Sequence, residues 1–75
     1  MKKILVFGGF GFLGYYLLKE LLSREYNVTV ADIKNDQDFE GIVDYIKCDI
    51  SVQKEVEFVF ENNNFDVVYN LSLIH

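Results

Sequence analysis

Four glycines fall within seven residues near the start of the sequence, in the run Gly-Gly-Phe-Gly-Phe-Leu-Gly at positions 8–14. An apolar, uncharged stretch at residues 4–7 precedes this run, and a stretch with helical periodicity follows it. Glycines between a strand and a helix let the backbone turn sharply and let the helix pack closely on the sheet. The chain is therefore constrained to a strand, loop and helix unit whose helix N-terminus offers unpaired N–H groups to an anion.

Beyond this unit, the sequence alternates between strand and helix patterns. Strands are predicted at residues 4–7, 28–31, 42–46 and 66–74, and helices at residues 12–23 and 52–62. The polar segment 34–41 is interpreted as a loop or a single irregular turn, and Ser51 as the N-cap of the second helix. Strands joined by helical crossovers indicate an α/β fold with a doubly wound, mostly parallel sheet.

Both predicted helices have an apolar side and a charged side. The apolar stripe of the first consists of Leu13, Leu17, Leu18, Leu21 and Leu22, and its water-facing side carries Lys19, Glu20 and Arg24. In the second helix, the packing side consists of Val56, Phe58, Val59 and Phe60, and the solvated side of Glu55, Glu57 and Glu61. We expect each helix to cover the sheet with its apolar side.

The glycines satisfy two dinucleotide-binding spacings at once, G-x-G-x-x-G from Gly9 and G-x-x-G-x-x-G from Gly8. Backbone N–H groups and the helix dipole would hold a diphosphate here without a basic side chain. Asp32 follows at the end of the next predicted strand, where a carboxylate can bind the ribose hydroxyls and repel a 2′-phosphate. The pattern predicts NAD as the cofactor. NADP stays as a less favoured alternative, since Lys34 lies close enough to pair with a 2′-phosphate.

Composition argues against several other classes of protein. The 75 residues allow one domain, and a net charge of -5 does not suit a protein that binds nucleic-acid phosphates or an anionic membrane. Cys48 is the only cysteine, so no intrachain disulfide and no metal site are expected, and a cytoplasmic location is favoured. The apolar run at residues 4–18 is too short for a membrane span, and no signal-peptide cleavage site follows it.

The glycine run together with Asp32 resembles the start of the extended short-chain dehydrogenase/reductases, the NAD-dependent epimerase/dehydratase family. Cys48-Asp49-Ile50 is similar to an acid-containing motif after that family's third strand, and residues 66–72 are similar to its fourth strand. The resemblance implies the N-terminal half of a Rossmann-type doubly wound parallel sheet with strand order 3-2-1-4.

The same resemblance implies which residues contact the cofactor. The Asp49 carboxylate and the Ile50 backbone would contact adenine, and the end of the fourth strand would pass under the cofactor. The expected cofactor-binding residues are Gly8, Gly9, Phe10, Gly11, Phe12, Leu13, Gly14, Asp32, Ile33, Asp49, Ile50, Leu71 and Ser72. Asn70 stands where the family usually has His, and Ser72 and Leu73 replace two small residues.

No catalytic residue is expected in this sequence. The family carries a Tyr-x-x-x-Lys pair and an upstream Ser or Thr beyond the fourth strand, and its substrate-binding half follows later. Tyr15 and Lys19 have the Tyr-x-x-x-Lys spacing but lie in the first predicted helix, where they are ordinary i, i+4 neighbours. Residues 1–75 are therefore expected to form a single partial NAD(P)-binding domain without the catalytic and substrate-binding parts.

Three hypotheses for the function follow. The leading one is an NAD-binding segment of an NAD-dependent epimerase/dehydratase, which acts on a nucleotide sugar when complete and is inactive alone. The second is a non-catalytic dinucleotide-binding or regulatory module, or a subunit that completes a partner's fold, and the third is a gene remnant. In each case the apolar fourth strand would lie at the sheet edge, which predicts self-association or a partner chain.

Overall fold

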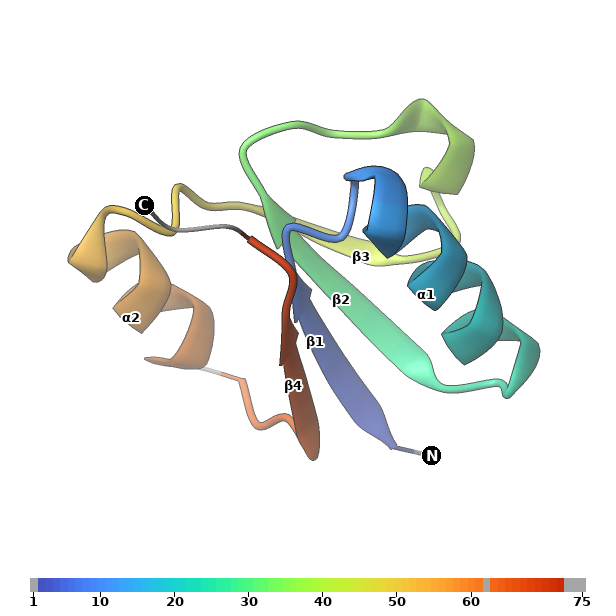
Figure 1. Ribbon diagram of the computed structural model, residues 1–75. Coiled ribbons are helices and arrows are strands. Elements are labelled where there is room, and N and C mark those ends of the chain that lie inside the picture. The colour runs from blue at the N-terminus through green and yellow to red at the C-terminus, as the bar shows by residue number, and fades with distance from the viewer. Residues whose placement is uncertain (1, 62, 73–75) are drawn as a thin grey trace.

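A four-stranded parallel sheet organises the chain in the computed structural model, which describes residues 2–61 and 63–72 (Figure 1). The elements are β1 (Lys3–Phe7), α1 (Phe12–Ser23), β2 (Asn27–Asp32), the 3-10 helix η1 (Gln37–Phe39), β3 (Asp44–Lys47), α2 (Gln53–Glu61) and β4 (Val67–Asn70). The strand order is β3-β2-β1-β4, and all three strand pairs are parallel. The predicted α/β class and the strand order 3-2-1-4 are confirmed.

Alternating residues of the central strands form a separate core on each face of the sheet. Ile4 and Val6 of β1 belong to the cluster under α1, whereas Leu5 and Phe7 belong to the cluster under α2. Strand side chains point to opposite faces in turn, so a strand with helices on both sides is apolar throughout. Figure 1 shows α1 on one side of the sheet and α2 on the other. The continuous apolar run of β1 is explained by this double burial.

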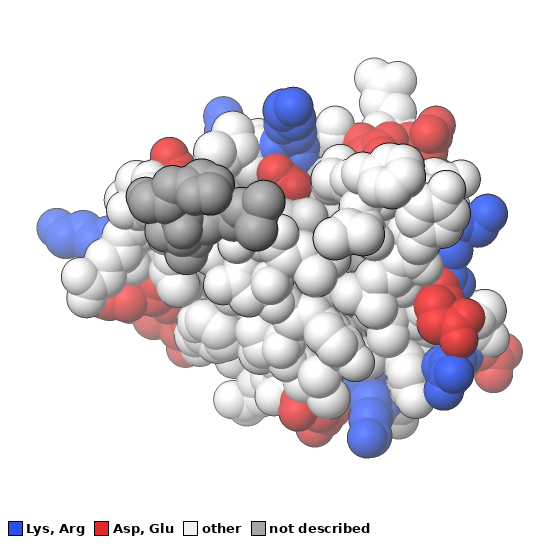
Figure 2. All heavy atoms as spheres, viewed as in Figure 1, with Lys and Arg blue, Asp and Glu red and all other residues white. Residues whose placement is uncertain are grey.

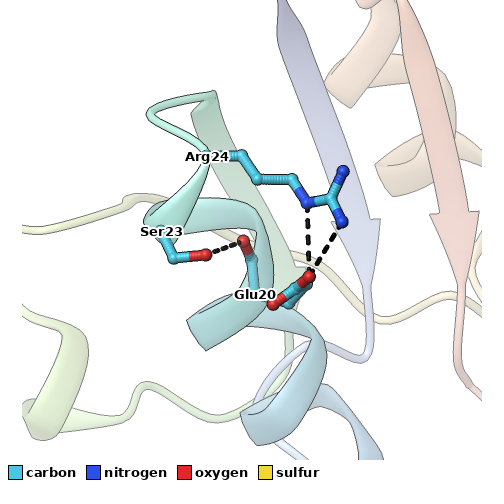
Figure 3. Close-up of polar contacts among 3 residues, drawn as sticks. All are labelled: Glu20, Ser23 and Arg24. Carbon is cyan, nitrogen blue, oxygen red and sulfur yellow. Dashed lines mark hydrogen bonds and ion pairs between the residues drawn. The ribbon is translucent and has the colours of Figure 1, made fainter.

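Helix α1 packs on the sheet through Leu18 and Leu21, which are both buried. Leu13 was expected in the same stripe, but it is 69% exposed, because the buried side of α1 runs through Gly14, Leu18 and Leu21 and position 13 points about a quarter turn away from it. On the far side, Arg24 forms an ion pair with Glu20 at 3.0 Å, and the Ser23 hydroxyl donates to the Glu20 carbonyl (Figure 3). The predicted water-facing side of α1 is confirmed.

Helix α2 differs from the prediction at its start and on its packing side. It begins at Gln53, and the carbonyl of Val52 accepts the N–H groups of Glu55 and Val56. The prediction that Ser51 is the N-cap is wrong, because its hydroxyl donates to the Asp49 carboxylate instead. Val59 is fully buried as expected.

The expected packing of both phenylalanines of α2 is only partly correct. Phe58 is 60% exposed, so it does not belong to the core. Phe60 is 42% exposed, but its ring lies 5.9 Å from that of Phe7 and 6.2 Å from that of Phe65. A short amphipathic helix buries only one narrow stripe of side chains, which in α2 runs through Val59. Phe60 lies next to this stripe and is only partly covered.

The third and fourth strands are shorter than the sequence pattern suggests. At the start of β3, the N–H groups of Ile42 and Val43 both donate to the Phe39 carbonyl, so a turn continues from η1 to Val43 and the strand begins at Asp44. At the end of β4, the side chain of Asn70 accepts the N–H of Ser72. The last described bond from this segment to β1 joins the Leu71 N–H to the Phe7 carbonyl at 2.9 Å, just beyond the end of β4. The predicted continuation through residues 73–74 lies outside the described residues.

Charged side chains lie mainly around the margin of the face drawn in Figure 2, and its centre is largely uncharged. Lysine and arginine do not gather into a patch on this face. In the part of the chain that the structure describes, no helix is both long and apolar enough to cross a membrane.

Candidate dinucleotide-binding site

The turn after β1 depends on glycine at position 8. Gly8 has a φ of +72°, and its N–H donates to the Ala31 carbonyl of β2 at 2.9 Å. A Cβ at this position would lie 2.6 Å from the Ser72 hydroxyl oxygen and 3.0 Å from the Ser72 nitrogen. Both the left-handed backbone and the chain that leaves β4 therefore exclude a side chain here.

Close packing of helix on loop requires glycine at position 14. A Cβ on Gly14 would overlap the carbonyl group of Gly9, and Gly14 is buried. In contrast, a Cβ on Gly11 would meet only the Gly8 carbonyl oxygen, at 3.7 Å, and Gly11 is exposed. The described residues leave room for a side chain at Gly11, so their packing does not require glycine at this position.

A cavity of about 250 Å³ lies over this loop. Its walls are Gly8, Gly11, Phe12, Leu13, Gly14 and Leu71. The N-cap of α1 is Gly11, which makes no side-chain capping bond, and the first turn of α1 contains no acidic residue. The first backbone N–H groups of a helix have no partner within the helix, so they can bind an anion in this cavity.

The carboxylate of Asp32 is held by backbone N–H groups on both sides. Its Oδ2 accepts the N–H of Phe10 at 3.1 Å, and its Oδ1 accepts the N–H of Lys34 at 3.1 Å. The first bond ties the end of β2 to the glycine loop. Each carboxylate oxygen retains a lone pair for another donor, such as a sugar hydroxyl.

Asp49 follows β3 at the same edge of the sheet. Its Oδ1 accepts both the hydroxyl of Ser51 at 2.6 Å and the backbone N–H of Ser51 at 3.0 Å. These two hydrogen bonds lower the pKa of the Asp49 carboxyl below its usual value. The Asp49 N–H donates to the Glu55 carboxylate, and the next N–H back, that of Cys48, donates to the Asp32 carbonyl.

All the residues expected from the sequence to contact a cofactor follow the carboxyl end of a strand. The glycine loop follows β1, Asp32 is the last residue of β2 and Ile33 comes after it, Asp49 and Ile50 follow β3, and Leu71 and Ser72 follow β4. In a parallel sheet the carboxyl ends of all strands lie side by side, and we call the margin that they form the carboxyl edge. This margin is where α/β proteins bind ligands. Ile33 and Phe12 are exposed, at 56% and 79%, and each offers an apolar surface beside the loop.

Sequence reasoning missed Tyr45 and Phe39. The Tyr45 hydroxyl donates to the backbone carbonyls of Asp32 and Ile33, and its ring lies 5.7 Å from that of Phe10. The ring of Phe39, which is buried, stacks on Phe10 at 6.1 Å. The one available signal was a tyrosine, with its polar tip, in a predicted strand.

Tyr15 and Lys19 do not line the cavity over the glycine loop. The Lys19 ammonium is 5.4 Å from the centre of the Tyr15 ring, and both residues line a second cavity of about 480 Å³ between α1 and η1. The wall of that cavity includes neither the glycine loop nor Asp32. Within residues 2–61 and 63–72, no group of three or more His, Cys, Asp or Glu side chains could hold a metal ion.

The parallel sheet and the glycine loop at its carboxyl edge define a Rossmann-type nucleotide-binding fold. Residues 4–74 match the model of the NAD dependent epimerase/dehydratase family, and the chain belongs to this family. A comparison with curated proteins finds no match.

Among solved structures, the fold is similar to that of UDP-N-acetylglucosamine 4-epimerase from Bacillus cereus, with a TM-score of 0.74 and 23% sequence identity. The match covers 100% of this chain and 24% of the epimerase. The chain therefore corresponds in fold to about a quarter of that enzyme.

Proposed function

We propose that this chain binds NAD at the glycine loop and serves as the cofactor-binding part of an epimerase or dehydratase that acts on a nucleotide sugar. The observation that carries the proposal is the cavity over residues 8–14, with the Asp32 carboxylate hydrogen-bonded to the loop beside it. A family whose description is NAD dependent supports this choice of cofactor. The nucleotide-sugar substrate is supported by the name of the similar UDP-N-acetylglucosamine 4-epimerase.

In this proposal, the parts of the dinucleotide bind to different strand ends. The diphosphate lies against the N–H groups at the start of α1, and Gly11 lets the backbone approach it. Asp32 accepts the hydroxyls of the adenosine ribose, while Ile33, Asp49 and Ile50 border the adenine. Leu71 and Ser72, together with Phe12, lie under the rest of the cofactor.

Asp32 favours NAD over NADP for an electrostatic reason. A 2′-phosphate would stand beside a carboxylate, and like charges at close range repel each other. Lys34 contacts Asp32 through its backbone N–H and not through its ammonium group. The alternative in which Lys34 binds a 2′-phosphate is therefore not the one we propose.

The bound nicotinamide would supply hydride transfer, and the residues of this chain would bind and orient it. We assign no proton-transfer group to these 75 residues and expect no turnover from the chain alone. The proposal therefore requires further polypeptide for catalysis and substrate binding. The match to 24% of the similar epimerase supports this requirement.

Titration of the ¹⁵N-labelled chain with NAD and with NADP, followed by NMR, tests the proposal. We expect NAD to shift the amide signals of Gly8, Gly11, Phe12 and Leu13, and NADP to do so only at higher concentration. Gly11→Asp should abolish the shifts, because it adds a negative charge where the diphosphate binds and has room for its side chain.

Asn64→Asp is the matched control, because it adds the same charge in an exposed loop before β4, at the opposite edge of the sheet. It should bind NAD like the unchanged chain. Unaltered loop signals in the unchanged chain, or equal binding by Gly11→Asp, would contradict the proposal. Tighter binding of NADP than of NAD would contradict the role of Asp32 alone.

A further inference from the structure

Three residues from three different segments form a closed set of contacts beside the candidate site. The Tyr45 hydroxyl in β3 donates to the Asp32 carbonyl at 3.0 Å. The Asp32 carboxylate accepts the N–H of Phe10 at 3.1 Å, and the rings of Phe10 and Tyr45 lie 5.7 Å apart. The glycine loop, the end of β2 and the middle of β3 are thus joined through polar and aromatic contacts.

We propose that Tyr45 is a positioning residue that fixes the Asp32 carboxylate relative to the glycine loop and thereby sets the preference for NAD over NADP. The inference rests on the proposed function and deepens it. Tyr45 itself would not touch the dinucleotide. It acts through the backbone that carries Asp32.

The backbone leaves the sheet at the point where Tyr45 holds it. Asp32 is the last residue of β2 and pairs with Lys47, and the Ile33 carbonyl that follows has left the ladder. The Tyr45 hydroxyl is 3.3 Å from this Ile33 oxygen and 3.0 Å from that of Asp32, so one donor spans the last strand residue and the first loop residue. Among the described residues, no other side chain hydrogen-bonds these two carbonyls.

The strand register explains why a side chain from β3 can reach so far. Tyr45 lies opposite Val30, two residues before Asp32, and its long side chain extends along the sheet toward the strand end. Phe39 stacks on the Phe10 ring and is itself buried, which restricts the position that Phe10 can take. A phenylalanine at position 45 would fill the same space, so the hydroxyl serves the carbonyl contacts alone.

The hydroxyl keeps its proton at neutral pH. Burial and the negative charge of Asp32 both raise the pKa of Tyr45 above its usual value. The group is therefore a permanent donor under the conditions in which a dinucleotide would bind.

The discriminating variant is Tyr45→Phe, which retains the ring and removes the hydrogen bonds. Loss of one such bond should weaken NAD binding about three- to tenfold. Binding of NADP should change little, because it does not benefit from the position of Asp32. The selectivity ratio, which is the Kd for NADP divided by the Kd for NAD, should therefore fall. In the absence of any dinucleotide, amide hydrogen exchange should become faster at Phe10 and Lys34, whose N–H groups donate to Asp32.

Tyr26→Phe is the matched control, because Tyr26 is also half-buried but precedes β2 at the opposite end of the strand. It should leave the ratio and the exchange rates unchanged. In an Asp32→Asn background, Tyr45→Phe should have no further effect on the ratio. If Tyr45→Phe does not fold, Phe10→Leu removes the ring contact instead and should lower the ratio in the same direction.

The outcomes separate this inference from the proposed function. Equal weakening of NAD and NADP by Tyr45→Phe, or unchanged exchange at Phe10 and Lys34, would overturn the role of Tyr45 while NAD binding by the unchanged chain still stands. Failure of the unchanged chain to bind either dinucleotide would overturn the proposed function, and the selectivity role of Tyr45 with it.

Discussion

At the scale of single residues, the two acids at the carboxyl edge of the sheet are held by uncharged donors. Backbone N–H groups of Phe10 and Lys34 hold Asp32, and the hydroxyl and N–H of Ser51 hold Asp49. Neither carboxylate needs a basic side chain to stay in position. A site of this kind suits a chain with a net charge of -5, because its affinity for an anion would come from helix N–H groups and not from cations.

The Asp49 turn gives a prediction about pH. Hydrogen bonds from Ser51 lower the pKa of Asp49, so the stability that they add is complete above the usual value of 3.8 and is lost as the pH falls through the lowered value. Ser51→Ala removes the hydroxyl and should raise the pKa of Asp49 toward 3.8.

A ¹³C NMR titration of the side-chain carboxyl would measure this change. Ser51→Thr keeps a hydroxyl and should leave the pKa of Asp49 low. An unchanged pKa in Ser51→Ala would mean that the backbone N–H of Ser51 alone stabilises the carboxylate.

Residues whose role depends on nearby sequence were predictable, and those that depend on distant pairing were not. The left-handed turn at Gly8 and the tight packing at Gly14 follow from a local strand, loop and helix pattern. The role of Tyr45 was not predictable from the sequence, because its contact with Asp32 exists only when β2 and β3 pair in one particular register. The contacts of the expected site residues with a dinucleotide stay predictions.

At the scale of elements, the boundaries differed from expectation wherever a local hydrogen bond competed with the sheet. The apolar residues 42–43 satisfy a strand pattern, but their N–H groups bond to Phe39. After β4, the Leu71 N–H still bonds to the Phe7 carbonyl of β1, and the next N–H, that of Ser72, bonds to the Asn70 side chain. Hydrophobic periodicity depends on which side chains are buried and carries no information about such local bonds. It therefore predicts the order and type of the elements better than their ends.

Helix α1 offers a test of its packing with one substitution made at two positions. Leu18 is fully buried against the sheet, whereas Leu13 is 69% exposed. Leu18→Ala should lower the free energy of unfolding by about 2–5 kcal/mol, since it leaves a cavity in the core. Leu13→Ala should change it by less than about 0.5 kcal/mol.

Urea denaturation followed by far-UV circular dichroism would measure both variants. Similar losses at the two positions would show that Leu13 is packed in solution, and that the apolar stripe is as wide as the leucine spacing suggests. If Leu18→Ala is already unfolded without urea, its loss exceeds the stability of the unchanged chain, and the contrast with a folded Leu13→Ala remains the readout.

At the scale of the whole molecule, β4 is an open edge of the sheet. It pairs with β1 on one side, and the order of the four described strands leaves its other side without a partner. Val68 and Tyr69 of β4 are 45% and 38% exposed, and the centre of the face in Figure 2 is largely uncharged. Unpaired strand edges with apolar side chains promote association with other chains.

We therefore expect the chain to self-associate through β4, and Val68→Lys to reduce this association by placing a charge at the edge. Sedimentation velocity over a range of concentrations would measure it. Ile42→Lys is the matched control, because Ile42 is 58% exposed but lies just before β3, the strand at the opposite edge of the sheet. A monomeric unchanged chain, or an equal effect of both variants, would contradict the role of β4.

The position of β1 has a consequence for how the chain acquires its fold. β1 is the first of the four described strands to be made and lies inside the sheet, yet one of its two neighbours is β4, and the bond between Lys3 and Asp66 joins residues 63 positions apart. During synthesis on the ribosome, the side of β1 that pairs with β4 therefore stays unpaired until nearly all the described residues have been made. Contacts between such distant residues slow folding, and they leave an apolar strand available to chaperones during that interval.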